Sequence, residues 1–143
     1  MLKLTTTNPE DLEQIQEWLQ ADPWHSGDAR NSPKAMLSGS GALLCFCVQD
    51  DKGPVFYIRL DKENDLVRVA AQFAPENIVS KRRVILGLAR AFVPAAKKFA
   101  QDRGFKGLVF ESVNPKLIAF MNKLNFKPAG NNDFVLRFEV AHV

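Results

Sequence analysis

A short basic segment stands in front of a long helical pattern and has the residue types that bind an anion. Lys81, Arg82 and Arg83 precede Gly87 and Ala89, and a strand-like run ends shortly before them. The first N–H groups of a helix have no partner within the helix, and the helix dipole favours negative charge at that end. Arginine can hold a phosphate through two parallel hydrogen bonds, and small residues let a ligand approach the backbone. The segment therefore predicts a phosphate site, with a solvated helix start as the alternative.

The cysteines and histidines offer little metal chemistry. Cys45 and Cys47 lie two residues apart in an apolar run, so their side chains share one face of a strand and cannot close a stabilising loop. The histidines, His25 and His142, are too few to complete a ligand set with them. We expect no metal site and two small buried thiols. His25, which follows Trp24, is a further candidate for lining a substrate site.

The composition is that of one globular domain spanning residues 1–143. Hydrophobic residues make up 46% of the chain and charged residues 24%, which is enough apolar material for a sizeable core. No apolar run approaches the length needed to cross a bilayer, and the first residues lack the apolar core of a signal peptide. We therefore expect a cytoplasmic protein with no membrane partner. The net charge of +3 is small, so we do not expect a nucleic-acid partner.

Hydrophobic periodicity and turn residues predict a mixed α/β domain with antiparallel hairpins first and a β-α-β crossover later. Strands are expected at 2–5, 42–49, 54–60, 66–73, 107–113, 126–128 and 134–140. Helices are expected at 9–22, around 33–37, over the long pattern that runs from Ile85 to Ala100 and ends at Gly104, and at 115–123. The element order is then β-α-α-β-β-β-α-β-α-β-β. Pro94 lies inside the long helix and predicts a kink or break near Phe92.

Three local segments in this order resemble the GNAT superfamily, the acyl-CoA-dependent N-acyltransferases. Residues 100–105 look like the end of the family's central helix. Residues 114–126, from Asn-Pro to Lys-Leu-Asn-Phe, look like its next helix, and 73–76 like the segment that leaves the central strand. The resemblance covers the order of elements over the whole chain and is most specific between 66 and 126. It implies the GNAT fold, with acetyl-CoA as co-substrate.

In this family the pyrophosphate of the acyl-CoA lies on backbone N–H groups of a loop written Gln/Arg-x-x-Gly-x-Gly/Ala. Counting back from Gly104 places the loop's glycine at Gly87, its last small residue at Ala89 and its first position at Val84. The family's central strand and a helix-starting Asn contact the pantetheine arm. The resemblance implies an acetyl-CoA site made of Ala71, Gln72, Phe73, Lys81, Arg82, Arg83, Val84, Gly87, Ala89 and Asn114. Tight helix packing of the small residues and a pure N-cap role for the Asn remain alternatives.

The resemblance implies less about the catalytic side chains. Family members often use a Tyr on the later helix to protonate the leaving thiolate, and the matching residue here is Met121. The only tyrosine, Tyr57, lies on an early strand. Many members use a Glu on the central strand as the base, and 66–73 contains no acid. Glu76 and Glu111 are the nearest candidates, and either must lie within about 3 Å or one water of the amine.

Three hypotheses follow for the function. The first is transfer of an acetyl group from acetyl-CoA to an unidentified amine, which proximity and an oxyanion-stabilising N–H can support without a Tyr. The second is a catalytically inactive binding or assembly module that keeps the fold, with CoA binding either retained or lost. The third, RNA binding through the basic segment, predicts a steep salt dependence of affinity. Whether the chain forms a homodimer is left open.

Overall fold

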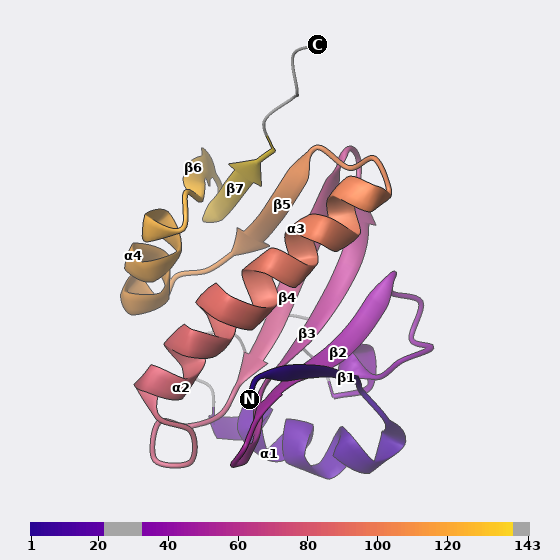
Figure 1. Ribbon diagram of the computed structural model, residues 1–143, viewed down its shortest axis with the longest axis vertical. Coiled ribbons are helices and arrows are strands. Elements are labelled where there is room, and N and C mark those ends of the chain that lie inside the picture. Colours follow the sequence, from indigo (N-terminus) through magenta and orange to yellow (C-terminus); the bar gives the residue numbers. More distant parts are fainter. Residues whose placement is uncertain (22–32, 139–143) are drawn as a thin grey trace.

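The computed structural model describes residues 1–21 and 33–138, and its strands form one twisted sheet (Figure 1). The sheet order is β1-β2-β3-β4-β5-β7-β6. The parallel pair is β4 with β5, and the other neighbours are antiparallel. The strands are β1 Lys3–Thr6, β2 Leu44–Asp50, β3 Gly53–Glu63, β4 Leu66–Phe73, β5 Gly107–Glu111, β6 Lys127–Gly130 and β7 Asp133–Arg137.

The helices follow the predicted order, and some of them differ from the prediction in their bounds or helix type. They are the 3-10 turn η1 Pro9–Asp11, α1 Leu12–Ala21, the 3-10 turn η3 Lys34–Met36, α2 Lys81–Leu86, the π-helical segment η4 Gly87–Phe92, α3 Val93–Asp102 and α4 Pro115–Lys123. The short helix expected around 33–37 is a single 3-10 turn. The predicted mixed α/β order is confirmed. His25 and His142 lie outside the described residues.

Helices cover both faces of the sheet. Neighbouring residues of a strand point to opposite faces, and the ring of Phe56 on β3 packs against Phe92 while the next residue, Tyr57, packs against Trp18 of α1. The long helix made of α2, η4 and α3 therefore lies on one face and α1 on the other. Figure 1 shows the long helix crossing in front of the sheet with α4 beside it. The buried run from Val55 to Ile58 fits a strand covered on both sides.

Pro94 is accommodated inside the long helix. The Val93 N–H donates to the Leu88 carbonyl, which is one residue further back than in an α-helix. This wider turn lies directly before the proline, which has no N–H of its own to place in the helix. The irregularity expected near Phe92 therefore takes the form of the π-helical segment, and the chain does not leave the helix there.

The ends of the helices match their sequence signals. Gly104 has a φ of +80° and terminates α3, as predicted, because glycine adopts this left-handed conformation without strain. Asn125 plays the same part after α4 with a φ of +73°. Both thiols are buried and free, as expected, and burial raises the pKa of Cys47 to about 12. Burial also raises the pKa of Cys45, so neither thiol is a reactive thiolate near neutral pH.

Metal-ligand clusters and membrane-spanning helices are both absent from the described residues. Between residues 1 and 21 and between 33 and 138, no cluster of three or more His, Cys, Asp and Glu side chains is placed to hold a metal ion. In the same part of the chain, none of the helices combines the length and the apolar character that spanning a membrane requires.

Candidate functional site

The two parallel strands separate before the first of them ends. Their ladder begins with Leu66 opposite Gly107 and stops with Val69 opposite Phe110, although β4 continues to Phe73. After β5 the chain leaves the sheet and enters α4. In α/β proteins, ligands bind beyond the carboxyl ends of parallel strands where neighbouring connections diverge. The end of β4 is therefore the expected position of a ligand site.

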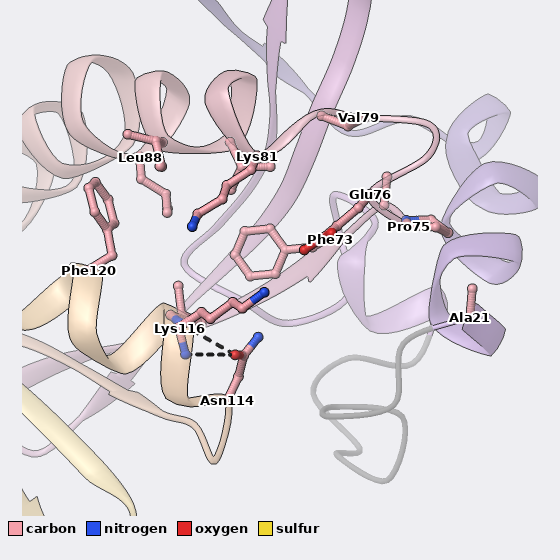
Figure 2. Close-up of a pocket in the computed structure, with 14 residues that line it drawn as sticks. Ala21, Phe73, Pro75, Glu76, Val79, Lys81, Leu88, Asn114, Lys116 and Phe120 are labelled. Atoms are coloured by element: carbon pink, nitrogen blue, oxygen red, sulfur yellow. Dashed lines mark hydrogen bonds between the residues drawn. The ribbon is translucent and has the colours of Figure 1, made fainter.

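A cavity of about 400 Å³ lies at this end of β4. Figure 2 shows it between the start of the long helix, the start of α4 and the segment that follows β4. Its volume is within the range of small-molecule sites. The described residues that line it are Ala21, Phe73, Ala74, Pro75, Glu76, Val79, Lys81, Val84, Ile85, Leu88, Asn114, Lys116, Leu117 and Phe120.

The cavity combines apolar walls with a few polar groups. Phe73, Leu88 and Phe120 supply bulky apolar surface from three different elements. Lys81 comes from α2 and Lys116 from α4, and Figure 2 shows both side chains extending into the space between the two helices. Among the described residues, neither lysine has a carboxylate within ion-pair distance. Such an arrangement suits an elongated ligand with an apolar part and an anionic part.

Asn114 is the N-cap of α4. Its side-chain oxygen accepts hydrogen bonds from the backbone N–H groups of Lys116, at 3.1 Å, and Leu117, at 3.5 Å (Figure 2). Its own N–H donates to the hydroxyl of Ser112, which fixes the turn between β5 and α4. The capping role is confirmed. The amide nitrogen of Asn114 lies at the cavity and has no described hydrogen bond, so a ligand contact is compatible with the cap.

Arg83 points away from the cavity. Its guanidinium forms two hydrogen bonds with the Asp50 carboxylate, Nε to Oδ2 at 2.6 Å and Nη2 to Oδ1 at 2.8 Å. This pair attaches the first turn of α2 to the end of β2, and the Ser80 hydroxyl caps the same turn by accepting from the Arg83 N–H. Arg83 therefore holds α2 to β2 through Asp50. It does not line the cavity with Lys81.

Replacing Asp50 with Asn is expected to lower the free energy of unfolding by about 1–2 kcal/mol at neutral pH. Hydrogen bonding by the Arg83 guanidinium holds the pKa of Asp50 below its ordinary value of 3.8. A carboxyl whose pKa is lower in the folded state stabilises the fold above its unfolded-state pKa, and this contribution disappears as the pH falls through the folded-state value. Urea unfolding of the native chain and D50N should therefore differ at pH 7 and converge below pH 4. An equal difference at both pH values would contradict the assignment.

Gly87 serves helix packing. A Cβ built on it would come within 2.9 Å of the Phe56 ring and 3.3 Å of Val48, because the helix lies directly on the sheet there. Its N–H donates to the carbonyls of Arg83 and Val84, as expected inside a helix. The surroundings of Gly87 therefore fit the alternative given above, in which the small residue allows tight packing of the helix on the sheet. Ala89, two residues on, is half-buried and is not among the residues that line the cavity.

The expected cofactor residues divide into two groups. The cavity wall includes Phe73, Lys81, Val84 and Asn114. The others lie elsewhere on the same elements: Ala71, Gln72, Arg82, Arg83, Gly87 and Ala89. Within this second group Arg82 is exposed, whereas Gln72 is fully buried and donates from its amide nitrogen to the Phe73 carbonyl.

The acid–base candidates are separated by the structure. Glu76 is the only carboxylate among the described residues that line the cavity, and Figure 2 shows its side chain extending toward the Phe73 ring. Glu111 is exposed at the end of β5, opposite Asp133 of β7, and does not line the cavity. Met121 is buried in the core, and the neighbouring Phe120 faces the cavity instead.

Tyr57 is a structural residue. It is fully buried; its hydroxyl donates to Asp11 at 3.0 Å and accepts from the Gln14 amide at 2.7 Å. Burial raises the pKa of this phenol, so it stays protonated at neutral pH. It lies on the face of the sheet that α1 covers and holds η1 and the start of α1 to β3.

Lys116 is the main cavity residue that sequence reasoning missed. It lies in the first turn of α4, two residues after the N-cap, and so close to a predicted ligand contact. Its position next to Asn114 was the available signal, because the first turn of a helix faces the same opening as its cap. Leu117 and Phe120 are partly buried apolar residues that pack against the core, and they also form part of the cavity wall.

No family model and no curated protein matches the sequence. Solved structures match over nearly the whole chain at low identity. The ribosomal-protein-S18-alanine N-acetyltransferase of Escherichia coli is 16% identical with a TM-score of 0.66, covering 99% of this chain and 97% of that one. An aminoglycoside acetyltransferase in complex with coenzyme A is 14% identical with a TM-score of 0.73, covering 96% and 95%. A GNAT family acetyltransferase of Brucella melitensis in complex with acetyl-CoA is 13% identical with a TM-score of 0.60, covering 100% and 92%.

These similarities define the class of fold. At such identities they show the architecture, and this agrees with the sheet order and the single parallel pair described above. The chain has the fold of the GNAT acetyltransferases, as the resemblance in its sequence implied.

Proposed function

We propose that the chain is an N-acetyltransferase that binds acetyl-CoA in the cavity between β4, α2 and α4. The observation that carries this proposal is the position of the cavity, which opens where the β4–β5 ladder stops at the Val69–Phe110 pair. Structures with the same fold have been solved in complex with coenzyme A or acetyl-CoA, which supports the choice of ligand. The apolar walls suit the pantetheine arm, and the lysines suit its phosphates.

The proposed reaction is direct transfer. The amine nitrogen attacks the thioester carbonyl, the C–N bond forms as the C–S bond breaks, and coenzyme A leaves as a thiolate. Glu76 accepts the proton that the amine releases, because it is the only carboxylate among the described residues that line the cavity. Met121 has no proton to donate, so solvent protonates the thiolate. Holding the two reactants together supplies much of the rate.

Calorimetric titration with acetyl-CoA tests the proposal. Because the cavity is largely formed in the described structure, we expect saturable binding with one site per chain and a dissociation constant on the order of micromolar. Titration with adenosine is the control, since it lacks the pantetheine arm and the phosphates and should bind far more weakly. Failure of acetyl-CoA to bind at millimolar concentration would contradict the proposal.

A second candidate is a binding or assembly module that keeps the CoA site without catalysis. The specific observation in its favour is Met121, which takes the place of a proton donor and is buried away from the cavity. Both candidates predict acetyl-CoA binding, so they are separated by turnover. Release of coenzyme A above the uncatalysed rate with any member of a broad amine panel would exclude the module.

A further inference from the structure

The position that the sequence pattern predicts for the diphosphate of acyl-CoA lies inside a helix. The long helix begins at Lys81, with Ser80 as its N-cap, so residues 84–89 are helical. The Gly87 N–H is used by carbonyls of the preceding turn, and a Cβ on Gly87 would meet the Phe56 ring. A diphosphate cannot reach these backbone groups without opening the helix. Arg83 is held by Asp50 and does not line the cavity.

Two other cations face the cavity from opposite sides. Lys81 is the first residue of the long helix, and Lys116 lies in the first turn of α4. Their side chains are exposed and extend into the same space (Figure 2). No described carboxylate lies within ion-pair distance of either ammonium group.

Their placement is electrostatically unfavourable in the empty protein. A cation in the first turn of a helix opposes the helix dipole. Neither first turn contains an acidic residue that would offset the charge. The two like charges also face the same cavity, so they repel each other. An anion between them would relieve both effects at once.

We infer that Lys81 and Lys116 together bind the diphosphate of the acyl-CoA, in place of the backbone of residues 84–89. This inference rests on the proposed function and adds which residues recognise the anionic part of the ligand. Lysine ammonium groups bind phosphate as point charges with three donors each. The apolar walls deeper in the cavity then receive the pantetheine arm, with the thioester toward Glu76.

Dissociation constants for coenzyme A and for pantetheine, which lacks phosphate, test this assignment. Lys81→Gln and Lys116→Gln are each expected to weaken coenzyme A binding about tenfold, the loss of one charge-assisted contact. Both variants should bind pantetheine with a dissociation constant within about twofold of the native one, since no charged contact to it is removed. Lys123→Gln is the matched control, because this exposed lysine is also on α4 and does not line the cavity. It should leave coenzyme A affinity unchanged.

The outcomes separate this inference from the proposed function. Native coenzyme A binding that neither lysine variant weakens would overturn the inference and leave the proposed function standing. An equal loss for pantetheine would also overturn it, by showing that the substitutions disturb the cavity as a whole. A native chain that binds neither ligand at millimolar concentration would overturn both. Thermal unfolding of each variant checks that the fold is retained, which we expect because both lysines are exposed.

Discussion

Replacing Glu76 with Gln is expected to lower the rate of acetyl transfer about 100-fold, at the low end of what a positioned general base contributes. Glutamine has nearly the same shape and cannot accept the amine proton. Acetyl-CoA affinity should change by less than about twofold, because the substitution removes no charged contact to the phosphates. Single-turnover kinetics with saturating acetyl-CoA and the best amine of the panel would measure the chemical step directly.

Glu111→Gln is the matched comparison for this experiment. Glu111 was an equal candidate in the sequence, and the structure places it at the exposed end of β5, outside the cavity wall. Its substitution should leave the transfer rate unchanged. A full rate for E76Q together with a large loss for E111Q would show that Glu111, and not Glu76, is the general base. Full rates for both variants would show that transfer proceeds without a carboxylate base, by proximity alone.

Replacing Arg68 with Met is expected to lower the free energy of unfolding by about 3 kcal/mol, near the lower limit for breaking a buried ion pair. Arg68 is 7% exposed, and its guanidinium forms paired hydrogen bonds with two carboxylates. The distances to Glu63 are 3.1 and 2.6 Å, and those to Asp133 are 2.7 and 3.1 Å. These bonds connect β4 to β3 on one side and, across β5, to β7 on the other.

The expected value is at the lower limit because Glu63 is 40% exposed and recovers part of its hydration. Lys98→Met is the control: Lys98 pairs with Asp102 on the exposed surface of α3, at 79% and 56% exposure. Its loss should change stability by less than about 0.5 kcal/mol. Denaturant unfolding at pH 7 compares both variants with the native chain. Equal effects of the two substitutions would contradict the structural role of Arg68.

Much of the fold is predictable from local signals. Alternating and apolar runs place the strands within a few residues, because side-chain burial in a strand follows a period of two. Asn114 and Gly104 mark helix ends correctly, since capping depends on residues adjacent in sequence. The order of elements then leaves few topologies, and the parallel β4–β5 pair follows from the helical crossover between them.

The candidate site is less predictable because its contacts are distant in sequence. Arg83 belongs to a tight basic cluster, and only the folded chain brings Asp50, which is far away in sequence, to its guanidinium. Gly87 fits a ligand-loop pattern equally well, and its close approach to Phe56 depends on how the helix lies on the sheet. Lys81 and Lys116 come from different helices, and tertiary packing alone places them on one cavity.

A crystal structure of the chain grown with acetyl-CoA would test the central claim most directly. We predict the ligand in the cavity beyond the Val69–Phe110 pair, with its diphosphate within hydrogen-bonding distance of Lys81 and Lys116 and its thioester facing Glu76. A cavity that stays empty at saturating acetyl-CoA, or a ligand bound on another surface of the sheet, would contradict the claim.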